Sequence, residues 1–349
     1  SLFVLKGELR VGDTATLKLI KQVVWVGTSI ILITIGLGVK GLVFGLLIGL
    51  GVMLILGWYK VSTRPSSFSK RHAYSLFQYS KYNFFTNAGG YFYSWVDVAI
   101  IGFFLTQTHV GAYEAAWRIT VVVILLSKSI STAMFPQMSR WDTNDSSSQI
   151  ESAIREAIAP SLLVVIPSFF GILLFSSQIL RFVFGSEFEI AWLALIVLMG
   201  EKIIQSVHMI LGRSLQAIDQ PNLAARAGVI AIVINLILNL LLIPKFGIVG
   251  AALATTISFT CNSTLHAYYL SQFISIELPY IRIAGIVGAS IGMSVILRIT
   301  QSIVGLSNLV HLIIIILLGI ISFIVFSLLI PSLRKMLLGH VYRLVSSLL

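Results

Sequence analysis

The chain has 349 residues, of which 57% are hydrophobic and only 11% are charged, and its mean hydropathy is +0.97. This composition excludes a soluble globular domain and is typical of an integral membrane protein. A net charge of +11 would suggest nucleic-acid binding in a soluble chain, but here the basic residues follow the loops, so no nucleic-acid partner is expected.

Ten apolar segments are long enough to cross, or nearly cross, a hydrocarbon layer of ~30 Å. Because a helix satisfies its own backbone hydrogen bonds in lipid, the predicted fold class is an all-α integral membrane bundle of about ten transmembrane helices. In chain order the segments cover residues 22–37, 41–59, 84–105, 110–137, 156–175, 190–216, 223–243, 248–272, 280–301 and 309–330.

Basic residues gather in alternate loops between these segments. By the positive-inside rule, both chain ends face the cytoplasm in a multi-pass protein of the cell inner (cytoplasmic) membrane. One cytoplasmic loop alone holds Lys60, Arg64, Lys70, Arg71 and Lys81, whereas the outer loops and their edges hold only Lys40, Arg181, Lys245 and Arg298.

The first two spans repeat a later pattern of the chain, as the halves of many transporters do. The matching positions are Gly38 with Gly247, Gly41 with Gly250 and Tyr59 with Tyr268, each 209 residues apart. We therefore expect residues 1–59 to be the last two helices of a first lobe, of which roughly 136 residues with four helices are absent from this chain. The polar face of the following hairpin would then lie open. A genuine ten-span protein is the alternative.

The remaining chain divides into four parts. Residues 60–83 are polar and basic, then aromatic, which indicates a cytoplasmic linker followed by an interfacial helix. Residues 84–273 hold six spans and are expected to form the complete second lobe. Residues 274–331 hold two accessory transmembrane helices, and residues 332–349 have the pattern of a cytoplasmic amphipathic tail on anionic lipid.

The third and fourth spans form a hairpin that carries charged residues into the hydrocarbon. Asp97 and Arg118 lie at similar distances from the connecting turn, so we expect them at similar depth, as an ion pair that faces the interior. Glu114 and Lys128 lie on roughly the same side as Arg118. A charge at such depth costs at least ~2.5 kcal/mol and usually marks a transport pathway, so all four are substrate-binding candidates. A structural ion pair that locks two helices is the alternative.

The sixth span carries a polar stripe at mid-membrane. Glu201, Gln205, His208 and Gly212 recur on one helical face, whereas Lys202 points about a quarter turn away. Glu201 and His208 are therefore candidates for coupling to an ion or a proton, and interhelical hydrogen bonding is the alternative.

Polar residues of the next two spans are interpreted as packing surfaces. Asn235 and Asn239 share a face with small residues in the seventh span, and Thr255 lies on a similar face of the eighth. Faces of this kind let membrane helices approach and form hydrogen bonds with each other.

The sequence does not indicate catalysis. Cys261 is the only cysteine and lies in an apolar span, and the six histidines show no metal-ligand spacing. No Ser, His and acid pattern suggests a hydrolytic site. We therefore expect no catalytic residue, no metal, no cofactor and no enzymatic activity.

Four stretches together resemble the polysaccharide transport branch, with its O-antigen type oligosaccharide-lipid flippases, of the multidrug, oligosaccharidyl-lipid and polysaccharide exporter superfamily. Their order and spacing carry the resemblance, which covers nearly the whole chain. The stretches are DVAIIG at 97–102, VGAYEAAWRI at 110–119, TAMFP at 132–136 and IPKFGIVGAALAT at 243–255.

The resemblance implies two six-helix lobes around a cavity, which move undecaprenyl-diphosphate-linked oligosaccharide to the outer leaflet by alternating access for O-antigen and lipopolysaccharide synthesis. It also implies that Arg118 is a cavity arginine, because related lipid-precursor flippases have one in a stretch similar to residues 116–119. The implied partners are the diphosphate head group of the lipid-linked oligosaccharide, membrane lipids and other polysaccharide assembly proteins.

Two other functions compete with this one. A cation-coupled multidrug antiporter of the same superfamily would bind H⁺ or Na⁺ at Asp97 and Glu201. Cavity charge separates the two, because a drug site needs uncompensated carboxylates and a diphosphate site needs uncompensated Arg or Lys. A membrane glycosyltransferase or polymerase usually has a large outer loop or domain, whereas every predicted outer loop here is short.

Overall fold

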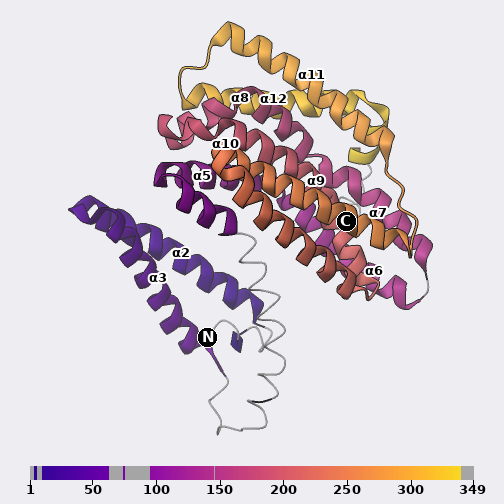
Figure 1. Cartoon of the computed structure of the whole chain (residues 1–349), viewed down its shortest axis with the longest axis horizontal. Helices are drawn as coiled ribbons and strands as arrows, with labels where there is room; N and C mark the ends of the chain where they lie inside the picture. Colours follow the sequence, from indigo (N-terminus) through magenta and orange to yellow (C-terminus); the bar gives the residue numbers. More distant parts are fainter. Residues whose placement is uncertain (1–3, 6–9, 63–73, 75–94, 145, 339–349) are drawn as a thin grey trace. The chain divides into compact units, whose positions relative to one another are not determined.

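The computed structural model describes residues 4–5, 10–62, 74, 95–144 and 146–338. Every regular element among them is a helix, which confirms the predicted all-α class. The chain divides into two compact units, Ser1–Phe84 and Phe85–Leu349 (Figure 1).

The first unit contains a hairpin of two helices. Helix α2 (Val11–Leu32) continues through a short π-helical segment (Ile33–Leu37) into α3 (Gly38–Lys60). Positive φ angles of 95° at Gly36 and 50° at Gly38 reverse the chain, and glycine adopts such angles without steric cost.

Small residues and one ionic cluster hold this hairpin together. A side chain at Gly49 of α3 would strike the backbone of α2 at Lys21, so glycine is needed for the helices to touch. At the other end of the hairpin, Asp13 binds Arg10 at 2.8 Å and Lys60 at 2.5 Å. These side chains are partly exposed, so the cluster contributes little beyond fixing the register of the two helix ends.

The second unit is a helical bundle with α9 at its centre, packed against α5, α6, α7, α8 and α10. Helices α11 and α12 pack on each other and on α8 (Figure 1). The elements are a short helix at Trp95–Phe104, α5 (Gln107–Val123), α6 (Leu125–Thr143), α7 (Ser147–Leu162), α8 (Val165–Phe184), a 3₁₀ segment (Ser186–Ala191), α9 (Trp192–Ala217), α10 (Pro221–Ser271), α11 (Tyr280–Val304) and α12 (Leu309–Leu329).

Six helices in the described part of the chain are long and apolar enough to cross a membrane. Helices α5 and α6, bent by 48° relative to each other, would together make a seventh. Two of the six, Gly12–Lys60 and Pro221–Ser271, are 49 and 51 residues long, and at ~1.5 Å per residue each is enough for two crossings. The predicted total of ten spans stays a prediction, since residues 84–94 lie outside the described residues.

Helix α10 folds back on itself at Gly247, between the predicted spans 223–243 and 248–272. Gly247 leaves the helical region with φ 59° and ψ −140°, and Gly38 of the first unit has the closely similar φ 50° and ψ −131°. The backbone thus supports the predicted match between the two turns. That the chain lacks most of a first lobe, and that one polar face lies open, stay predictions.

The predicted domain boundaries also stay predictions. Most of the linker and interfacial helix at 60–83 lies outside the described residues, as does the end of the amphipathic tail from residue 339. Within the second unit, α11 and α12 match the two accessory helices predicted at 274–331 in number and position.

Candidate functional site

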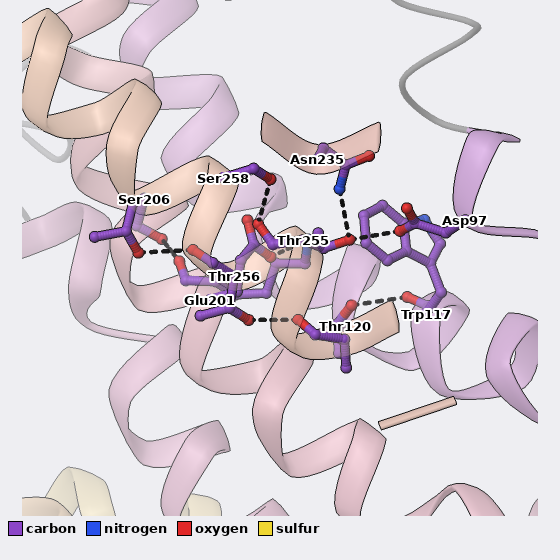
Figure 2. A network of polar contacts seen from close by, with 12 residues as sticks. Asp97, Trp117, Thr120, Glu201, Ser206, Asn235, Thr255, Thr256 and Ser258 are labelled. Carbon is purple, nitrogen blue, oxygen red and sulfur yellow. Dashed lines mark hydrogen bonds and ion pairs between the residues drawn. The ribbon is translucent and has the colours of Figure 1, made fainter. Parts of the chain in front are cut away.

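Asp97 is the centre of a buried polar network in the second unit (Figure 2). The residue is 6% exposed and lies on the helix at Trp95–Phe104. Its carboxylate accepts hydrogen bonds from Tyr113 Oη at 2.9 Å, Asn239 Nδ2 at 2.6 Å and Thr255 Oγ1 at 2.5 Å. All three donors are neutral, so they stabilise the carboxylate without compensating its charge.

The fold-back of α10 brings most of these donors together. Asn235 and Asn239 lie one turn apart on the first arm, and Thr255 lies on the second arm. Asn239 Nδ2 donates to Asn235 Oδ1 at 3.1 Å, and Asn235 Nδ2 donates to Thr255 Oγ1 at 3.5 Å (Figure 2). Gly250 allows this approach, because a side chain there would strike the backbone of Leu242 on the first arm.

The predicted ion pair between Asp97 and Arg118 is wrong. Counting residues from the turn estimates depth along the hairpin, but it does not fix the direction in which a side chain points. Helix α5 buries Tyr113 and Thr120, whereas Arg118 lies about 140° around the helix from Tyr113 and has an exposed side chain (71%). Tyr113 therefore takes the place beside Asp97, which has no ion-pair partner among the described residues.

Arg118 on α5 and Lys128 on α6 are both exposed cations. In the described part of the chain, the only ion-pair partner of Arg118 is Glu114, one turn away at 3.4 Å. Lys128 follows the bend at Ile124, is exposed and has no ion-pair partner among the described residues. Glu114 is thus the only carboxylate paired with either of these two cations among the described residues.

Glu201 and Lys202 form a second charged group, inside the bundle. Both residues are fully buried on α9, and Lys202 Nζ lies 2.6 Å from Glu201 Oε2. Because the two residues are adjacent on one helix, their charged groups lie close together, but the angle between them is unsuited to a hydrogen bond. Neither carboxylate oxygen of Glu201 nor Nζ of Lys202 has a hydrogen-bond partner. Lys202 Nζ also lies 4.1 Å from the ring centre of Trp117, as a cation–π contact across to α5.

The structure separates the predicted polar stripe of α9 into two groups. Glu201 belongs with Lys202, its ion-pair partner at 2.6 Å. His208 instead packs edge-on against His266, with ring centres 4.5 Å apart, and against Phe259. The ion-coupling roles predicted for Glu201 and His208 both stay predictions.

Sequence reasoning missed four members of the Asp97 network, namely Tyr113, Asn235, Asn239 and Thr255. It interpreted the last three as packing residues, and it placed Lys202, the ion-pair partner of Glu201, off the polar stripe. The spacing of Asn235 and Asn239, one turn apart and opposite Thr255 across the glycine turn, was the signal that could have found the network.

The Asp97 network combines one carboxylate with neutral amide and hydroxyl groups. No group of three or more His, Cys, Asp or Glu that could hold a metal ion occurs among the described residues. The network instead offers one carboxylate with amide and hydroxyl oxygens, which are hard ligands. Asn239 Oδ1 is buried without a hydrogen-bond partner. The oxygen and the nitrogen of an amide group are assigned from its hydrogen bonds. With the Asn239 amide turned by about 180°, Oδ1 would face Asp97, and an ion between the two side chains would contact this oxygen and the carboxylate.

Comparison with known sequences finds one family and several relatives. Residues 3–192 match the family described as polysaccharide biosynthesis protein. The probable low-salt glycan biosynthesis flippase Agl15 of Haloferax volcanii is 51% identical over 98% of this chain and 72% of its own length. The probable flippase AglR of the same organism is 31% identical over 84% of this chain and 62% of its own length.

A solved structure shares the fold. The lipid II flippase MurJ, in an inward closed conformation, superposes with a TM-score of 0.75 at 21% sequence identity. The match covers 89% of this chain and 65% of MurJ, so this chain spans about two thirds of that structure.

Proposed function

The chain belongs to the polysaccharide biosynthesis protein family, and we propose that it is a flippase that moves a lipid-linked oligosaccharide across the membrane. The cargo binds through its diphosphate head group. The cavity that holds it opens to one leaflet and then to the other, which is the alternating-access mechanism. The named relatives are flippases, which are transporters and not enzymes, as the sequence predicts for this chain. The undecaprenyl carrier, the O-antigen or lipopolysaccharide product, the inner membrane and the cytoplasmic chain ends stay predictions.

The observation that carries the proposal is the exposed guanidinium of Arg118 on a membrane helix. A charge in lipid is costly, so an exposed arginine at this depth supports a wet cavity beside α5. Arg118 is held by a single ion pair of 3.4 Å, which leaves most of its five N–H donors for a ligand. Arginine with a phosphate forms a bidentate, charge-assisted pair, and Lys128 adds a second cation on the same segment.

The placement of charges favours this function over a drug antiporter. Arg118 and Lys128 are exposed and positive, whereas the uncompensated carboxylate, Asp97, is buried. An anionic head group therefore matches these exposed cations. The buried carboxylate is a site for a coupling cation, and Asp97, Asn235, Asn239 and Thr255 would hold that ion.

Reconstitution of the protein in liposomes tests the function. A fluorescent polyprenyl-diphosphate disaccharide is placed in one leaflet, and its appearance in the other leaflet is followed by quenching from outside. We expect protein-dependent translocation of this probe and no efflux of a cationic dye from the same liposomes. Dye efflux without translocation would show that the antiporter function is the correct one.

Arg118→Lys is expected to lower translocation by about tenfold although the positive charge is kept, because lysine lacks the planar fork that binds a phosphate bidentately. Initial rates at equal protein density measure the effect. Arg298→Lys on α11 is the matched control, since Arg298 is an exposed arginine that contacts only its own helix at Gln301 in the described part of the chain. Full activity of the Arg118→Lys protein would contradict a diphosphate site there.

A further inference from the structure

Helix α9 and the second arm of α10 meet at a pair of histidines. The rings of His208 and His266 lie edge to face with their centres 4.5 Å apart, and Phe259 packs on His208 at 4.9 Å. Gly212 lies beside both rings, since a side-chain carbon there would be 3.6 Å from each of them. The pair is a direct contact between two helices, separate from the hydrogen bonds around Asp97.

The polar atoms of this contact are incompletely satisfied. His266 Nδ1 lies 2.9 Å from the backbone oxygen of Asn262, and because a carbonyl oxygen only accepts, Nδ1 carries the hydrogen and Nε2 is the basic nitrogen. His208 Nδ1 is buried without a hydrogen-bond partner in the described part of the chain, and so is Asn262 Oδ1. Asn262 shares one face of α10 with Phe259 and His266, so this oxygen lies on the side that meets His208.

No carboxylate of the described residues forms an ion pair with either ring. The elements around the pair are α6, α7, α9, α10 and α11. Their carboxylates are Asp142, Glu151, Glu156 and Glu201, and α10 and α11 have none. Their cations are Lys128, Arg140, Arg155, Lys202, Arg213, Arg226, Lys245, Arg282, Arg298 and, beside the rings, only the histidines themselves; Cys261, Tyr268, Tyr269 and Tyr280 are their remaining titratable groups. A proton on either ring would therefore add a positive charge to a cationic surrounding.

We propose that the contact between His208 and His266 is pH-sensitive: it holds α9 against the second arm of α10 while both rings are neutral, and it separates when one ring takes a proton. A buried imidazolium without a carboxylate is costly, whereas water stabilises it. Asn262 Oδ1 is a neutral acceptor and would offset only part of that cost. Histidine is the side chain whose charge ordinarily changes between pH 5 and pH 8, so the change falls in an accessible range.

Protons can reach the pair from the end of the bundle where both helices stop. His266 lies little more than one turn before α10 ends at Ser271, and His208 lies between two and three turns before α9 ends at Ala217. These two ends pack in one apolar cluster, which contains Ala217 and Leu270. Separation at the histidines would therefore loosen one end of the bundle, next to water.

The melting temperature of the intact protein in nanodiscs, measured from pH 8 to pH 5.5, tests the energetic part of the inference. Each proton that only the separated form takes up favours separation by about tenfold per pH unit below ~6.5, so the melting temperature of wild type should fall in this range. His208→Phe keeps a ring of similar shape, breaks no hydrogen bond of Nδ1 and cannot be protonated. The fall should shrink in this variant.

Two further variants keep the test informative. His266→Asn retains an N–H donor for the Asn262 carbonyl, so it replaces His208→Phe if that protein does not fold, and the double variant should show the smallest fall. His311→Gln is the matched control, because His311 hydrogen-bonds Ser307 at an exposed position beside α12. It should keep the pH response of wild type.

Distances between spin labels test the structural part. Labels are attached at Gln216→Cys and Tyr268→Cys, which are exposed near the ends of α9 and α10, in a protein whose native cysteine is removed by Cys261→Ser. Lowering the pH from 8 to 5.5 should add a population with a longer distance. The same labels in the His208→Phe protein should show a smaller change.

The outcomes do not depend on the cargo, so they are separate from the proposed function. A pH-dependent fall in melting temperature that is as large in the double variant as in wild type would overturn the inference, and so would label distances that stay the same at both pH values. Absence of glycolipid translocation, with both pH series as expected, would contradict the flippase function alone.

Discussion

Asp97→Asn should abolish the stabilisation of the protein by Na⁺ and lower cation-dependent translocation by at least about tenfold. The substitution keeps the size of the side chain and removes the uncompensated charge, so the core becomes neutral without an ion. A buried unpaired charge destabilises the folded protein. Without added Na⁺, the melting temperature of the variant should therefore be equal to or higher than that of wild type. A structural role alone would give the opposite sign of stability change.

Thermal unfolding in nanodiscs and translocation in liposomes measure the two effects. The matched control is Asp219→Asn, which makes the same chemical change at an exposed position between α9 and α10. Asp219 has a positive φ of 55°, which asparagine also adopts readily, so the control should fold normally. If Asp97→Asn keeps the Na⁺ response of wild type, the coupling ion does not bind at Asp97.

Much of this fold follows from hydrophobic length and glycine placement. Apolar runs of about 20 residues predict membrane helices wherever they occur. The sequence predicts a break between the spans 223–243 and 248–272, and the structure leaves the helical conformation there at Gly247. These features are local, so they can be deduced from neighbouring residues alone.

The site was harder to predict because it depends on helix rotation. Arg118 and Tyr113 are five residues apart on α5, yet one is exposed and the other is buried against Asp97. Apolar and polar residues are mixed around α5, so its sequence is compatible with several rotations of the helix about its own axis. Packing against α9 determines which rotation the helix adopts. The pairing of Lys202 with Glu201 has the same origin, since both of these adjacent residues of α9 are buried in the bundle.

Gly250→Ala should strongly destabilise the second unit. The added methyl group would strike the Leu242 carbonyl, which is backbone and cannot turn aside. The two arms of α10 must then separate, and overpacking of this kind costs ~1–3 kcal/mol or more. Separation of the arms also moves Thr255 away from Asn235, so the variant should lose the Na⁺ response together with thermal stability.

The matched control is Gly228→Ala on the first arm of the same helix. No atom lies within 4 Å of a side-chain carbon at Gly228, and alanine favours a helix more than glycine does, so this variant should melt at or above the wild-type temperature. Melting temperatures with and without Na⁺, together with the folded yield, compare the two proteins. Equal melting of both variants would mean that the arms of α10 do not depend on close contact at Gly250, and the Asp97 network would then need another support.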